Sequence, residues 1–172
     1  MSERNYQYTV GKNYIGELRL DGKVDITDPC YDKGTWCRMS SECVPGYYTG
    51  YAYVIDEGEF GMRVAKIEIV KDDIECYDYE LIGDIGVDAG MAGFFRDKPD
   101  YPGDEWIKFL VWSGVFKADE TYNYDKEFYA IDYGIFSSSG YGDGGYYVYA
   151  NKERTAFMIE FISEDDEDEE DW

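Results

Sequence analysis

The chain has 172 residues, which suits one folded domain and is long enough to bury a core without a disulfide or metal staple. It contains no histidine, so it lacks the usual general base near neutral pH and a common ligand of zinc and iron. The formal net charge is −22, and because eight of the acids lie in Glu164–Asp171, the rest of the chain still carries −14. Such a surface repels phosphate backbones and anionic lipids, which disfavours direct binding to nucleic acids or membranes.

Alternation of apolar and polar residues, typical of strands with one face on a core, recurs along the chain. In Val64–Ile69, for example, Lys66 and Glu68 alternate with apolar residues. Asp21-Gly22 and Asp56-Glu57-Gly58 each predict a hairpin, and Pro45-Gly46 predicts a turn. The other predicted strands are Ile15–Leu20, Lys23–Thr27, Tyr47–Ile55, Tyr77–Ile82, Phe128–Phe136, Tyr146–Tyr149 and Ala156–Ile162.

One segment has helical periodicity instead. Trp106, Phe109, Leu110 and Ser113 are spaced i, i+3, i+4 and i+7, and Pro102, Asp104 and Glu105 before them are typical of a helix start, with Gly114 as the stop. We therefore predict a mostly β fold of the β-rich α+β type, an antiparallel sandwich or partly open barrel with one short helix. Residues 1–163 form one β-rich domain in this interpretation, and 164–172 form an acidic, disordered tail.

The N-terminal residues have no apolar signal-peptide segment, and no apolar run approaches the ~20 residues that span a bilayer. We expect a cytoplasmic protein whose cysteines are reduced. Cys30, Cys37, Cys43 and Cys76 lack the close Cys-x-x-Cys pairs of zinc sites, so ordinary thiols and no cofactor are expected.

Three motifs occur in order: Ile26-Thr27-Asp28-Pro29, Gly86-Val87-Asp88-Ala89-Gly90, and the glycine- and tyrosine-rich run 139–149. With Val44-Pro45-Gly46-Tyr47-Tyr48 and Arg63-Val64-Ala65 between them, the chain resembles the DUF4241 family of uncharacterised bacterial and phage proteins over roughly residues 17–162. The resemblance implies a mostly β domain with no established activity. The sequence departs from the family pattern at Tyr147, where proline is common, and in its acidic tail.

The motifs also supply candidate ligand-binding residues. If the loops holding Asp28, Asp88 and Asp143 converge, their carboxylates could coordinate a cation or hold a polar ligand, although aspartate beside glycine or proline is also typical of turns. The backbone of Gly140, Gly142 and Gly144 could cradle an anion. Ser137–Ser139 has neither a histidine base nor a Gly-x-Ser-x-Gly elbow, so no catalytic residue is assigned.

Nineteen tyrosines make the predicted strands unusually aromatic. Tyrosine fits an ordinary half-buried sheet, but an exposed patch of it would suit a protein interface or a planar ligand. Trp172, at the end of the acidic tail, could act as an anchor. The candidate partner-binding residues are Tyr47, Tyr51, Tyr53, Tyr147, Tyr149 and Trp172.

Two hypotheses about function follow. The favoured one is a non-enzymatic acidic binding protein, such as a phage or bacterial inhibitor or immunity-like factor, that occupies a basic, nucleic-acid-binding partner. The alternative is a small-ligand or divalent-metal binding domain, including a metal-dependent hydrolase, that uses Asp28, Asp88 and Asp143.

Overall fold

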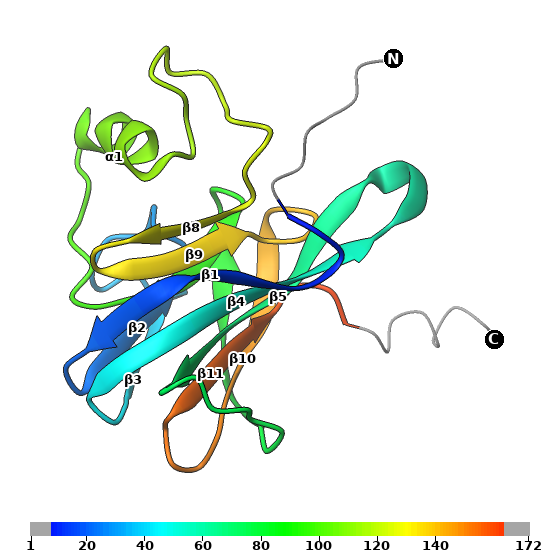
Figure 1. Ribbon diagram of the computed structural model, residues 1–172. Coiled ribbons are helices and arrows are strands. Elements are labelled where there is room, and N and C mark those ends of the chain that lie inside the picture. The colour runs from blue at the N-terminus through cyan, green and yellow to red at the C-terminus, as the bar shows by residue number, and fades with distance from the viewer. Residues whose placement is uncertain (1–7, 164–172) are drawn as a thin grey trace.

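The computed structural model describes residues 8–163, which form two antiparallel β-sheets packed face to face. The six-stranded sheet has the order β1-β4-β5-β11-β10-β6, and the five-stranded sheet the order β3-β2-β7-β9-β8 (Figure 1). The first comprises β1 (Gly11–Leu20), β4 (Gly46–Asp56), β5 (Met62–Lys71), β11 (Ala156–Glu160), β10 (Gly144–Ala150) and β6 (Glu80–Val87). The second comprises β3 (Met39–Glu42), β2 (Lys23–Thr27), β7 (Met91–Phe95), β9 (Gly134–Ser138) and β8 (Phe128–Ile131).

A third layer covers the outer face of the five-stranded sheet. It contains the helix α1 (Glu105–Ser113), which lies beside β8 and β9 in Figure 1. Phe109 and Leu110 of the helix are buried in a cluster with Phe95 and Phe136 of the sheet. Gly114 ends the helix with a φ of 95°, a left-handed conformation that glycine adopts without a steric penalty. The outer face of the six-stranded sheet has no such helix above it among residues 8–163.

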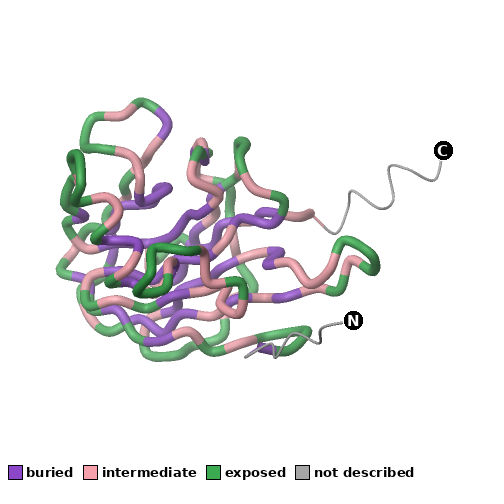
Figure 2. The backbone as a smooth tube through the Cα atoms, turned by 90° about the horizontal axis from the view of Figure 1, so that it is seen from above, coloured by how far each residue is buried: buried purple, intermediate pink, exposed green. Residues whose placement is uncertain are grey.

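The main core lies between the two sheets, where the inward-facing side chains of the strands are mostly apolar. Figure 2 shows the buried residues concentrated in the interior of the molecule and the exposed residues mainly at its periphery. The sheets approach closely because glycine replaces larger residues at the contact. A Cβ on Gly50 of β4 would lie 2.6 Å from Cδ1 of Ile135, which fills that space from β9. The core residues include Leu18, Ile26, Tyr48, Ile67, Ile69, Phe94, Ile135, Val148, Phe157 and Ile159.

The structure confirms the predicted fold class, a mostly β antiparallel sandwich with one short helix, and corrects several elements. The predicted strand Phe128–Phe136 is a hairpin, β8 and β9, with a turn at Asp132-Tyr133. The segment predicted as the strand Tyr77–Ile82 becomes a strand only at Glu80 and continues to Val87. Strands β3 and β7 were not predicted. Asp21-Gly22 is not a hairpin turn, because β1 pairs with β4 while β2 pairs with β3 and β7 in the other sheet.

Candidate functional site

Asp28 lies directly after β2 and is fully buried. Its Oδ1 accepts a hydrogen bond from the backbone N–H of Cys30 at 2.8 Å, and its Oδ2 accepts bonds from Asp88 at 2.8 Å and Ala89 at 2.6 Å. Burial raises the pKa of Asp28, and the three N–H donors oppose part of that rise. Both carboxylate oxygens are therefore engaged in joining the loop after β2 to the turn after β6.

The three predicted loops do meet at one end of the sandwich. Asp28 bonds the backbone of Asp88, and Gly144 pairs with Val87, which places Asp143 beside the end of β6. The side chains differ in environment, however, because Asp88 and Asp143 are exposed and that of Asp28 is buried. Among residues 8–163, no group of three His, Cys, Asp or Glu side chains could hold a metal ion. The contact between these loops is therefore made by backbone groups and by the Asp28 carboxylate alone.

The predicted glycine-rich loop is a tight turn, which we call the glycine turn (residues 139–142). The backbone carbonyl of Ser139 accepts a hydrogen bond from the N–H of Gly142 at 2.9 Å. The Ser139 hydroxyl donates to the carbonyl of Gly142 at 2.9 Å. Gly140 has a φ of 61°. The Tyr146 hydroxyl donates a hydrogen bond to the Gly142 carbonyl at 2.6 Å, which stabilises the turn. The Ser139 hydroxyl is thus engaged in a hydrogen bond within the turn.

A hollow of 350 Å³ opens beside the glycine turn. Its other walls come from the tip of the β4–β5 hairpin, from Gly90, and from the loop before β8. Arg63 and Glu127 are its charged residues, and Phe60, Tyr122, Tyr124 and Tyr141 are its aromatic ones. Of the six predicted ligand-binding residues, Gly140 and Gly142 line this hollow, whereas Asp28, Asp88, Asp143 and Gly144 do not.

The four cysteines are free thiols. Burial and the nearby Asp28 carboxylate raise the pKa of Cys30, because both oppose formation of a thiolate. Cys30 is therefore a thiol at neutral pH, with little nucleophilic character.

The two groups of predicted partner-binding tyrosines lie on one face of one sheet. Strand pairing runs across all six strands from Tyr14 through Tyr51, Glu68, Met158 and Tyr149 to Leu81. Directly paired residues point to the same side of a sheet. A neighbouring row runs from Lys12 through Tyr53, Lys66, Glu160 and Tyr147 to Asp84. Tyr47, paired with Arg19, extends the same face.

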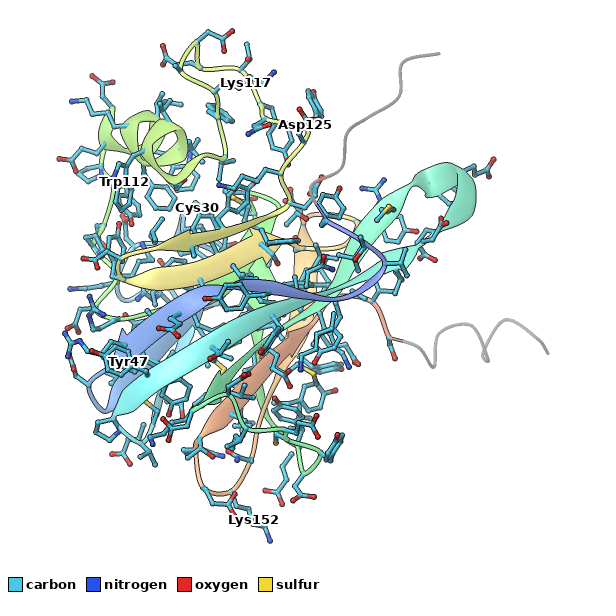
Figure 3. The ribbon with its side chains drawn as sticks, in the orientation of Figure 1. Cys30, Tyr47, Trp112, Lys117, Asp125 and Lys152 are labelled. Atoms are coloured by element: carbon cyan, nitrogen blue, oxygen red, sulfur yellow. The ribbon has the colours of Figure 1, made fainter. Side chains whose placement is uncertain are left out.

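We call this surface the tyrosine face: Tyr14, Tyr47, Tyr51, Tyr53, Tyr147 and Tyr149 on the outer side of the six-stranded sheet. Tyr14 is 60% exposed, Tyr47 62% and Tyr147 56%. Figure 3 shows Tyr47 at β4 and Trp112 with α1, in different layers of the molecule. Tyr14 was not among the predicted residues. Simple alternation could not place it, because a register irregularity after Tyr14 brings Tyr14, Glu17 and Arg19 to the same side of β1.

Carboxylates hold several of these rings in place. Glu68, buried at the centre of the face, accepts the Tyr53 hydroxyl at 2.8 Å and also the Tyr79 hydroxyl. Tyr51 donates to Asp73, and this hydrogen bond to a carboxylate is the main cause that raises the pKa of Tyr51 to about 12. Lys12 lies 4.1 Å from the centroid of the Tyr51 ring. Tyr51 and Tyr53 are therefore preorganised, while Tyr14, Tyr47 and Tyr147 are exposed.

An acidic segment borders the tyrosine face. Residues 72–88, which include the edge strand β6, contain seven Asp or Glu residues and no Lys or Arg. The Tyr51–Asp73 and Tyr79–Glu68 hydrogen bonds hold this segment against the face. We call residues 72–88 the acidic rim. Tyr77 within it is 83% exposed.

Comparison of the chain with protein-family models, with curated proteins and with solved structures gives no match. The resemblance to the DUF4241 family therefore stays a prediction. No helix within residues 8–163 is long and apolar enough to cross a membrane. Trp172 and the acidic tail lie outside the described residues.

Proposed function

We propose that the protein is a non-enzymatic binding protein that docks a basic partner protein on its tyrosine face. The observation that carries the proposal is the union of two tyrosine groups, far apart in sequence, on one sheet face that no helix of residues 8–163 covers. Tyrosine is enriched at protein interfaces because its ring buries a large area and its hydroxyl still finds a polar partner.

Preorganisation of the face supports this proposal. The bonds from Tyr53 to Glu68 and from Tyr51 to Asp73 restrict both side chains before any partner arrives. Restricting a side chain in the free protein reduces the conformational entropy lost on binding, which is about 0.5–1.5 kcal/mol for a flexible interface residue. Tyr14, Tyr47 and Tyr147, which are each more than half exposed, then supply contact area.

Charge supports a basic partner. The acidic rim contains seven carboxylates, one of which, Asp73, is bonded to Tyr51 of the face, and the whole chain carries −22. A positively charged surface, such as the nucleic-acid-binding groove of a toxin or nuclease, complements this field, whereas DNA and RNA themselves are repelled. We propose an inhibitor or immunity-like role on this basis, in the cytoplasm, where the free cysteines would stay reduced.

The alternative, a metal-dependent or ligand-binding site on the three aspartates, has less support. The Asp28 carboxylate already accepts three backbone hydrogen bonds, and releasing it would leave those partly buried N–H groups without their acceptor.

The experiment is affinity capture from host cells, in which the protein carrying Tyr51→Ala and Tyr147→Ala is compared with the wild type. We expect a basic partner that the wild type retains at 0.15 M salt (about physiological) and that the double variant loses, with Kd at least about tenfold higher. Added DNA should displace the partner without binding to this protein.

Tyr124→Ala is the matched control, because Tyr124 is 59% exposed but lies in the loop before β8 and not on the tyrosine face. It should retain the partner. Recovery of the same proteins with wild type and double variant, or direct tight binding of this chain to DNA or RNA at physiological salt, would refute the proposal.

A further inference from the structure

Arg63, at the start of β5, has an unusual setting for a cation in so acidic a protein. Its Nε donates to the carbonyl of Phe60 at 3.0 Å, and its guanidinium carbon lies 4.9 Å from the centroid of the Tyr141 ring. No carboxylate of residues 8–163 forms an ion pair with it. Its guanidinium is thus fixed by a carbonyl and a ring, with its charge uncompensated by a direct carboxylate contact.

The hollow beside Arg63 has the size and walls of a small-molecule site. Its 350 Å³ falls within the range of about 300–1,000 Å³ usual for ligand pockets. Phe60, Tyr124 and Tyr141 are each more than half exposed, although they gather around one concavity. The ring of Tyr141 is held by its hydroxyl bond to Glu57 at 2.9 Å and by the edge of Phe60, at a centroid distance of 6.3 Å.

The glycine turn leaves its side of the hollow open. A Cβ built on Gly142 would meet no atom within 4 Å, so the absence of a side chain there leaves free space that a ligand can use. Gly142 has a φ of 110°, which also disfavours any other residue. Gly140 and Gly142 of the turn line the hollow together with Arg63.

We propose that this hollow binds a small aromatic monocarboxylate, with its carboxylate on Arg63 and its ring against Tyr141 and the neighbouring aromatic side chains. A guanidinium recognises a carboxylate in a planar, two-pronged geometry, and aromatic walls favour a planar ring. Glu127, which also lines the hollow, and the net charge of −22 disfavour dianions such as nucleotide phosphates. The site is distinct from the tyrosine face and does not depend on the proposed partner.

The test is a titration followed by backbone amide NMR, with benzoate, with its neutral counterpart benzamide, with AMP and with inorganic phosphate. We expect saturable binding of benzoate with Kd on the order of 1 mM, and shifts concentrated at residues 138–142 and Gly90. Benzamide should bind at least about tenfold more weakly, since it has lost the charge-assisted contact. Inorganic phosphate should give no saturable binding.

Arg63→Gln should weaken benzoate binding about tenfold or more. Arg63→Lys keeps the positive charge but loses the planar guanidinium, so it should weaken benzoate binding as well. This variant replaces Arg63→Gln in the test if Arg63→Gln does not fold. Lys152→Gln is the control, because it removes one positive charge from the exposed β10–β11 turn (Figure 3). The proposal would be overturned if benzoate showed no saturable binding, or if benzamide bound as tightly as benzoate. It would also be overturned if AMP or phosphate bound more tightly than benzoate, or if neither Arg63 variant changed the Kd for benzoate.

Discussion

Both oxygens of the Asp28 carboxylate accept backbone N–H bonds, from Cys30 on one side and from Asp88 and Ala89 on the other. An asparagine has the same shape but only one acceptor oxygen, so its NH2 group must face at least one of these donors. We expect Asp28→Asn to lower the free energy of unfolding by about 2–4 kcal/mol. Urea denaturation at pH 7 measures the change. Asp143→Asn, at an exposed position, should change stability by less than about 0.5 kcal/mol, and equal effects would contradict the structural role.

The pH dependence of Asp28 follows from its burial. Its pKa is raised from the ordinary value of 3.8, so between that value and the folded pKa the folded state binds more protons than the unfolded state. The contribution of this group to stability therefore falls as pH rises through the folded pKa. A carboxyl carbon NMR titration should give Asp28 a midpoint above 3.8. A midpoint below it would mean that the three N–H bonds outweigh burial.

Lys98 provides a second test, with the opposite sign of linkage. It is fully buried, donates to the carbonyl of Pro99 at 2.7 Å and lies 4.6 Å from the Tyr101 ring centroid. Burial, followed by the charge of Arg38, lowers the pKa of Lys98 to about 8 from 10.5. The folded state therefore binds fewer protons between these values, and the contribution of Lys98 to stability rises as pH increases through that range.

We expect the stability of the wild type relative to Lys98→Met to increase by about 1–3 kcal/mol between pH 7 and pH 10. Urea unfolding of both proteins at several pH values measures this difference, and the variant cancels the titration of the other groups. A difference that stays constant over this range would show that Lys98 has an ordinary pKa.

At the scale of elements, close contact between strands depends on glycine in β7. A Cβ on Gly93 would lie 2.1 Å from the carbonyl oxygen of Ile135 and 2.4 Å from Cβ of Phe136, both in the adjacent strand β9. Neither atom can move without disrupting the pairing. Gly93→Ala should therefore destabilise the protein by about 3 kcal/mol or more, whereas Gly145→Ala, whose nearest atom is 3.9 Å away, should change stability by less than about 1 kcal/mol. Thermal unfolding of the two variants compares them, and similar melting temperatures would contradict the packing argument.

Periodicity predicted the strands whose one face is polar, such as β2, β4 and β5, because alternation is visible in the sequence. It missed β7, where all five residues are buried between α1 and the core and no alternation survives. Residues considered only with their sequence neighbours also led to the wrong prediction of a hairpin at Asp21-Gly22. The chain passes there from one sheet to the other. Sheet membership is decided by distant partners, which a turn of two residues does not encode.

The candidate sites divide in the same way. The sequence indicated tyrosines on the outer side of β4 and of β10, because side-chain direction alternates within a strand. It could not indicate that these two strands belong to the same sheet. In the sheet, β5 and β11 lie between them, and in the sequence Tyr147 lies 90 residues after residue 57 of the β4–β5 turn. Arg63 belongs to one of the sequence motifs, but the motif does not reveal its position beside the glycine turn, which depends on how the strands pack together.

At the scale of the whole molecule, a net charge of −22 opposes the compact state through repulsion among carboxylates. Salt screens this repulsion, and lowering the pH towards 5 begins to neutralise it. The melting temperature should therefore rise as NaCl increases from about 20 to 500 mM at pH 7. Differential scanning calorimetry measures this change. A melting temperature that falls over this range would mean that attractive pairs, such as Arg38 with Asp25, dominate the electrostatics of the fold.

Salt should act in the opposite direction on partner binding. If the acidic rim attracts a basic partner, the association rate constant should fall about tenfold or more between 50 and 500 mM NaCl, because long-range attraction is screened. Contacts made by tyrosine rings are short-ranged, so the dissociation rate constant should change much less. Replacing Asp72, Asp78 and Asp84 by asparagine should reproduce the effect of salt, whereas Tyr51→Ala should mainly accelerate dissociation. Surface plasmon resonance separates the two rate constants. An association rate independent of salt would show that charge does not bring the partner to the tyrosine face.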